Sequence, residues 1–204
     1  MHDKGLTAQK TICETAYLES AMIWLVSGLI VWTIAHLFKR VFPSVRETMG
    51  TRGRYLIGFV LTASLGAMIY GHMNMDAYDL YALPVWAWYV NNVLMFVAIF
   101  LFDAGKVKGV TRTMVRHPML WAVVVWSLAH LLVNGDQASI VLFGGLGLWA
   151  LLEIVVINRA EGTWTPPIRG SWSGDFKLAG VVVIIYAAIV GIHYGLDRAP
   201  LVWM

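Results

Sequence analysis

Hydrophobic residues follow one another along this chain in six long stretches, and short polar segments separate these stretches. A helix needs about 17 to 25 apolar residues to cross the hydrocarbon of a membrane. The pattern therefore predicts six transmembrane helices, at approximately 21–38, 55–71, 86–102, 120–133, 138–157 and 178–196. Only residues 134–137 separate the fourth and fifth stretches, which are expected to form a tight antiparallel hairpin of helices.

The composition leads to the same class of protein. Of the 204 residues, 59% are hydrophobic and 13% are charged, which is more apolar surface than one soluble core of this length needs. Most of that surface is expected to face lipid. We predict an all-α polytopic membrane bundle in which residues 21–204 form one domain after a polar segment, residues 1–20.

The basic residues fall on one side of the predicted bundle. Loops 39–54, 103–116 and 158–177 carry twelve of the fifteen Lys and Arg residues, and the positive-inside rule makes that side cytoplasmic. Both termini are then periplasmic in a bacterial inner membrane. Residues 1–19 lack the pattern of a cleavable signal peptide, so the first span is expected to remain as an anchor. Anionic lipids suffice as partners for the basic charge, and no nucleic-acid binding is predicted.

Ionisable side chains interrupt the hydrophobic stretches, and most of them are histidines. An ionisable group in hydrocarbon costs roughly 3 to 15 kcal/mol, so such residues are functional hypotheses by default. The single cysteine excludes a zinc ribbon, and metal chemistry would have to use histidine. Several histidines together favour a bound cofactor, although water or a backbone carbonyl could satisfy each one. Those in or at the ends of spans are His36, His72, His117, His130 and His193.

The segment from Arg116 to Gly147, RHPMLWAVVVWSLAHLLVNGDQASIVLFGGLG, resembles the signature of the NnrU family. The segment WTIAHLFKRVFP around His36 and the tail IHYGLDRAPLV extend the likeness. Plant and cyanobacterial 15-cis-ζ-carotene isomerases are related to this family. The resemblance implies that His36 and His130 are axial ligands of the iron of haem b. It also implies redox-dependent cis–trans isomerisation of a polyene substrate, or a role in nitrogen-oxide metabolism.

Helix geometry limits which histidines can share a site. His117 and His130 are thirteen residues apart on one predicted helix, so about 20 Å separates them and they cannot bind the same ion. His36 and His130 come from different helices, but their depths in the membrane are expected to differ by about 10 to 15 Å. A tilted haem could absorb that offset. Otherwise His72 or His193 would complete the site with His130.

Further polar residues are expected near the cofactor. Asn91 or Asn92 could accept a hydrogen bond from a ligating imidazole. Glu153, the only acidic residue well inside a span, should be paired or protonated, with Arg116 as its nearest counter-charge. The basic groups here could hold haem propionates or could form a structural ion pair. The residues of this expected cluster are Arg40, Arg46, Arg116, His117 and Glu153.

Two alternatives stay open at this stage. The corner Arg116-His117-Pro118 followed by a helical hairpin also resembles isoprenylcysteine and methanethiol methyltransferases, in which Arg116, His117 and Glu153 would line an S-adenosylmethionine pocket. The sequence departs from that pattern because Ile154 replaces the second Glu. A haem protein without catalysis is the other alternative, and Ser127 stands where the plant isomerases carry cysteine. The sequence leaves the oligomeric state open.

Overall fold

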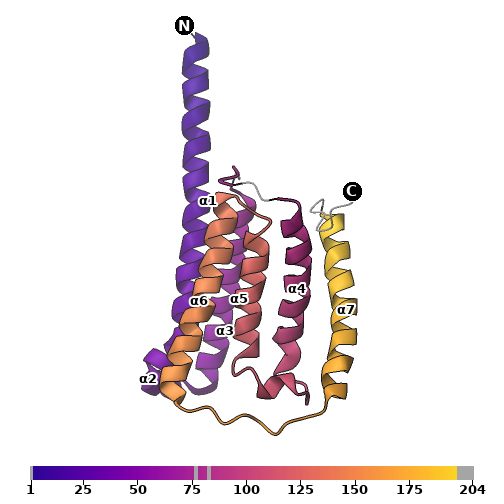
Figure 1. Ribbon diagram of the computed structural model, residues 1–204. Helices are drawn as coiled ribbons and strands as arrows, with labels where there is room; N and C mark the ends of the chain where they lie inside the picture. Colours follow the sequence, from indigo (N-terminus) through magenta and orange to yellow (C-terminus); the bar gives the residue numbers. More distant parts are fainter. Residues whose placement is uncertain (1, 76–77, 82–83, 197–204) are drawn as a thin grey trace. The chain divides into compact units, whose positions relative to one another are not determined.

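The computed structural model describes residues 2–75, 78–81 and 84–196, and for residues 2–16 only the backbone is described. Within these ranges all regular secondary structure is helical apart from an isolated bridge between Asp79 and Asp136. This confirms the all-α class. In chain order the elements are α1 (His2–Val41), α2 (Pro43–Thr48), α3 (Gly50–Met73), α4 (Trp86–Ala104), the 3-10 helix η1 (Thr111–Thr113), α5 (Pro118–Leu131), α6 (Gln137–Glu161) and α7 (Trp172–Gly195) (Figure 1).

Each of the six predicted stretches corresponds to one helix. Five helices are long and apolar enough to cross a membrane, and in α1 the suitable part is Tyr17–Val41. The sixth, α5, has 14 residues and is about 21 Å long, which is less than the roughly 30 Å of a hydrocarbon core. The short helix α2 was not predicted. Most of the polar segment 1–20 is helical and continues directly into the first span.

The two ends of α5 are defined in different ways. Pro118 begins the helix, where its missing N–H removes no intrahelical bond. At the other end, the side chain of Asn134 donates to the carbonyl of His130 at 2.9 Å. The hydroxyl of Tyr81 donates to the carbonyl of Leu131 at 2.7 Å. Carbonyls that the helix itself leaves without partners are thereby satisfied, which explains why α5 can end early.

The chain divides into two compact units, which are described separately here. Unit 1 consists of residues 1–80 and 136–142, and unit 2 of residues 81–135 and 143–204. In unit 1, α1 and α3 lie side by side (Figure 1). A Cβ atom added to Gly28 would lie 2.8 Å from the carbonyl oxygen of Ser64, and one added to Gly71 would lie 2.6 Å from that of Ala21. Glycine at these two positions lets the helix backbones approach closely.

In unit 2, α4 lies between α5 and α7 (Figure 1). Ala104 of α4 packs with Leu178 and Val182 of α7 in the core. The residues of α6 that belong to this unit run antiparallel to α5, since Gly147 meets Ser127 and Asn158 bonds to His117. The predicted hairpin of the fourth and fifth spans is thus confirmed.

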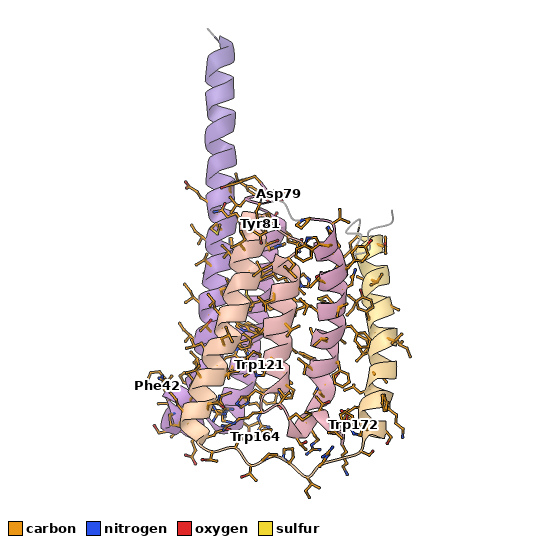
Figure 2. The ribbon with its side chains drawn as sticks, viewed as in Figure 1. Phe42, Asp79, Tyr81, Trp121, Trp164 and Trp172 are labelled. Atoms are coloured by element: carbon orange, nitrogen blue, oxygen red, sulfur yellow. The ribbon has the colours of Figure 1, made fainter. Side chains whose placement is uncertain are left out.

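The start of α7 is tied to the loop that follows α4. Asp175 is buried, and its carboxylate accepts hydrogen bonds from the backbone N–H groups of Val110 at 2.6 Å and Thr111 at 3.3 Å. Figure 2 shows Trp172 in the first turn of α7 and Trp164 in the loop before it. The sequence analysis did not single out Asp175. An acidic residue in the first turn of an apolar helix was the available signal.

Candidate functional site

A nine-residue pattern occurs twice in the chain. Residues 30–38 read IVWTIAHLF, and residues 124–132 read VVWSLAHLL. The two copies are identical at five positions and similar in character at the others. The first copy lies in α1 of unit 1 and the second, except its last residue, in α5 of unit 2. We call them the tryptophan–histidine motifs. The repeat is readable in the sequence but was not used to predict the site.

The two motifs have the same local geometry. The Nδ1 atom of His36 lies 3.0 Å from the carbonyl oxygen of Trp32, and that of His130 lies 2.9 Å from the carbonyl oxygen of Trp126. The histidine and tryptophan rings are in contact, with centroids 4.4 Å apart in the first motif and 4.8 Å in the second. The alanine before each histidine is buried.

These contacts fix which nitrogen of each imidazole carries the proton. A backbone carbonyl can only accept a hydrogen bond, so Nδ1 is the protonated nitrogen in both rings. In the neutral ring Nε2 then carries the lone pair that can bind a metal. A carbonyl that holds the other ring nitrogen is also the usual way in which a ligating histidine is oriented. The partner of Nδ1 in both motifs is therefore a carbonyl, and not Asn91 or Asn92 as expected.

His130 has a further aromatic neighbour in unit 2. The ring of Phe143 stacks on the imidazole with a centroid distance of 4.4 Å and an interplanar angle of 26°. The same Phe143 meets Trp126 edge to face at 5.0 Å. His36 and His130 are both half-buried. The second motif is thus held from the side by α6 as well as by its own helix.

The three other histidines in or at the ends of the spans differ in which ring nitrogen forms the polar contact. His193 repeats the carbonyl contact, with Nδ1 2.8 Å from the oxygen of Ile189. His117 uses Nε2 instead and donates it to Oδ1 of Asn158 at 2.9 Å. The Nε2 atom of His72 lies 3.3 Å from the hydroxyl of Ser139 in unit 1. His117 therefore resembles a structural residue that joins α5 to α6.

The prediction of an ion pair between Glu153 and Arg116 is wrong. Arg116 donates from Nη1 to the carbonyl of Gly162 at 2.7 Å, and its Nη2 lies 3.6 Å from Glu161. Glu161 ends α6 two turns beyond Glu153, and the left-handed backbone at Gly162, with φ of 67°, follows it directly. The acceptors for Arg116 are therefore at the helix end. Glu153 is buried, and its Oε2 has no hydrogen-bond partner within the described part of the chain.

Two other expected site residues have local roles. Arg46, in α2, donates from Nη1 to the carbonyl of Gly50 at 3.1 Å and so supports the turn between α2 and α3. Asn92 accepts a hydrogen bond of 2.7 Å from the hydroxyl of Tyr186, which links α4 to α7. Among the residues that the structure describes, no three His, Cys, Asp or Glu side chains gather as a metal site. A haem iron takes at most two protein ligands, so this finding concerns other kinds of metal centre.

Three comparisons with known proteins place the chain. A family model described as NnrU protein matches residues 24–199. A UPF0344 protein of Bacillus velezensis is 28% identical over 112 residues, which are 52% of this chain and 87% of the relative. The UPF0344 protein YisL of Bacillus subtilis is 25% identical over 116 residues, 54% of this chain and 91% of the relative. No solved structure matches the chain.

Neither relative carries a name that states an activity. The family match includes both tryptophan–histidine motifs and the corner Arg116-His117-Pro118. It also reaches into the tail that the sequence analysis quoted, of which residues 197–202 lie outside the described residues. Because the family model matches most of its length, this all-helical chain with membrane-spanning helices belongs to the NnrU family.

Proposed function

We propose that this protein binds haem b within the membrane, with His36 and His130 as the axial ligands. The observation that carries the proposal is the repeated tryptophan–histidine motif, in which Nδ1 of each imidazole is held by the carbonyl four residues earlier. This contact leaves Nε2 as the nitrogen that binds iron in each ring.

The remaining polar residues divide between the cofactor and the bundle. The contacts of Arg116 and His117 within unit 2 favour a structural role, because both tie the start of α5 to α6. We assign Arg46 as a donor to a haem propionate, since its guanidinium keeps further N–H groups besides the one that bonds Gly50. Glu153 is assigned to the surroundings of the cofactor, because a buried carboxyl in a membrane helix is rarely there for stability alone.

The protein's part in the reaction is to hold and shield the cofactor. A bound haem supplies reversible one-electron chemistry at an iron whose ligands can exchange. The motifs supply oriented ligands, and the apolar helices exclude water. The reaction class we propose is redox-dependent cis–trans isomerisation of a linear polyene similar to ζ-carotene. Ser127, one turn before His130, replaces the cysteine of the plant isomerases, so our proposal uses imidazole ligands only.

An absorption spectrum of the purified protein in detergent tests haem binding. We expect a Soret band that shifts on reduction with dithionite. His36→Ala and His130→Ala should each remove most of that band, and added imidazole should restore it by replacing the missing ring. His193→Ala is the matched control, because His193 has the same carbonyl contact but lies outside the motifs.

Three outcomes would contradict the proposal in different ways. A colourless protein that binds S-adenosylmethionine would make the chain a methyltransferase. Loss of the band in His193→Ala, with His36→Ala unaffected, would reassign one ligand. A haem protein that leaves every offered polyene unchanged, in the oxidised and reduced states, would reject the isomerase activity and leave haem binding in place.

We also propose that the protein lies in a bacterial inner membrane with both termini periplasmic. The support is the gathering of Lys and Arg in three loops that follow alternate spans. A phosphatase reporter fused after residue 204 should be active, because that enzyme matures only outside the cytoplasm. An inactive reporter in a stably expressed fusion would reject this orientation.

A further inference from the structure

A groove of about 350 Å³ opens on unit 2 between α4 and the start of α5. Figure 2 shows Trp121, one of its lining residues, in the first turns of α5. Trp121 and Met114 are exposed, so the groove is open to the surroundings of the protein. Arg116 is the one charged residue among those that line it. The lining residues are Leu101, Met114, Val115, Arg116, Trp121 and Val125.

Arg116 is the polar element of this groove. Its side chain is only 18% exposed, and two of its nitrogens are engaged by Gly162 and Glu161. The third nitrogen, Nε, is buried and has no hydrogen-bond partner within the described residues. The Nε atom of Arg112, in η1 of the same loop, is likewise buried and lacks a partner among those residues. Buried donors without acceptors are costly, so stability alone does not explain these two guanidinium groups.

The charged residues around the groove indicate which charge a bound ligand should carry. The loop between α4 and α5 contains Lys106, Lys108, Arg112 and Arg116, and Glu161 is the acidic residue that the structure pairs with Arg116. Guanidinium N–H groups form their strongest hydrogen bonds with phosphate and carboxylate oxygens. The rest of the groove is apolar and belongs to helices expected in the membrane, so a free inorganic anion would leave most of it unfilled.

We propose that this groove binds one anionic phospholipid. The phosphate pairs with the guanidinium of Arg116, the charged side chain among the lining residues, and an acyl chain lies against Leu101, Trp121 and Val125. The lipid comes from the membrane leaflet on the side of the basic loops, where anionic headgroups gather around basic residues. The groove shares Val125 with the second tryptophan–histidine motif but includes neither Trp126 nor His130, so lipid binding and haem binding can be tested separately.

Native mass spectrometry of the full-length protein tests the site. The protein is freed of bound lipid in detergent and then incubated with phosphatidylglycerol or with phosphatidylcholine of the same acyl chains. We expect one phosphatidylglycerol to remain bound, at several-fold higher occupancy than phosphatidylcholine. Arg116→Gln should abolish this preference. Lys106→Gln is the matched control, because it removes the same charge from the same loop, where Lys106 pairs with Asp103 outside the groove.

A second variant separates the groove from the charge. Leu101→Trp fills the apolar wall and keeps Arg116, and we expect it to reduce retention of phosphatidylglycerol as much as Arg116→Gln does. If Arg116→Gln does not fold, this variant decides alone. Equal retention of the two lipids by the unmodified protein, or undiminished retention in Leu101→Trp, would overturn the proposal. Displacement of the lipid by inorganic phosphate at moderate excess would assign the site to a free anion.

Discussion

In unit 1 the helices α1 and α3 pack around glycines, whereas in unit 2 polar side chains join several segments. In unit 1 the backbones of α1 and α3 come close at Gly28 and Gly71. In unit 2 hydrogen bonds link Asp175 to the loop after α4, His117 to Asn158 and Tyr186 to Asn92. Lipid is as apolar as the helices, so only close packing and hydrogen bonds can drive their association. Both means occur in both units, since His72 meets Ser139 in unit 1 and Gly147 meets Ser127 in unit 2, so the units differ in the balance between them.

The difference changes the setting of the tryptophan–histidine motifs. His36 lies near the end of a helix of 40 residues, where its ring contacts that of Trp32 on the same helix. His130 lies on a helix of 14 residues whose two ends are bonded to other segments, and Phe143 stacks on its ring. The two motifs share their sequence and local geometry. Contacts from α6 as well as from its own helix hold the ring of His130.

The largest effect is expected from a bulky residue at the glycine contact of unit 1. Gly71→Leu would bring its Cβ against the backbone of Ala21 and Leu25 in α1, which no side-chain rotation can relieve. Overpacking costs about 1 to 3 kcal/mol where neighbours can shift, and more is expected against backbone. We predict loss of monodisperse protein on size-exclusion chromatography. Gly66→Leu is the control, since nothing lies within 4 Å of a Cβ there.

The result for Gly66→Leu also shows whether glycine is needed throughout α3 or only at the contact. A stable Gly71→Leu protein would mean that α1 and α3 do not depend on close packing. In that case the contrast between the units would disappear.

The corresponding test in unit 2 removes a polar tie. Asp175→Ala deletes the acceptor of two backbone N–H groups, and each hydrogen bond to a charged group contributes about 1.5 to 3 kcal/mol. We expect a loss of about 3 kcal/mol and a clearly lower midpoint of thermal unfolding, followed by tryptophan fluorescence in detergent. Asp103→Ala should change the midpoint little, because its pair with Lys106 is largely exposed. Equal effects of the two substitutions would show that the hydrogen bonds to Asp175 do not stabilise the contact between α7 and the loop after α4.

The sequence predicts where the helices lie better than it predicts which segments they contact. Apolar length identified every membrane helix, because each stretch must cross the lipid whatever lies beside it. It also gave the length of α5, since the predicted stretch 120–133 and the helix both have 14 residues, but it placed the helix two residues too late along the chain, because the helix ends at Leu131. That end depends on bonds from Tyr81 and Asn134, and a contact between residues fifty positions apart leaves no local pattern.

For the candidate site, too, single residues were easier to predict than the contacts between them. His36 and His130 could be singled out because ionisable residues are rare in apolar stretches. The partner of Arg116 could not, because Glu153 and Glu161 are both far from it along the chain and only the fold decides between them. The repeated motif was readable in the sequence and was missed. A comparison of the chain with itself would have found it.

The smallest expected effect distinguishes two buried serines, one in each unit. Ser127 of α5 faces Gly147, and its hydroxyl has no hydrogen-bond partner within the described part of the chain. Ser64 of α3 is also buried, but its hydroxyl donates to the carbonyl of Leu61 at 2.8 Å. Ser127→Ala should therefore leave the unfolding midpoint unchanged or slightly raised, while Ser64→Ala should cost about 0.5 to 1 kcal/mol. A marked loss of stability in Ser127→Ala would mean that the hydroxyl bonds to a group bound beside His130, and a simultaneous change in the Soret band would identify that group as the haem or its surroundings.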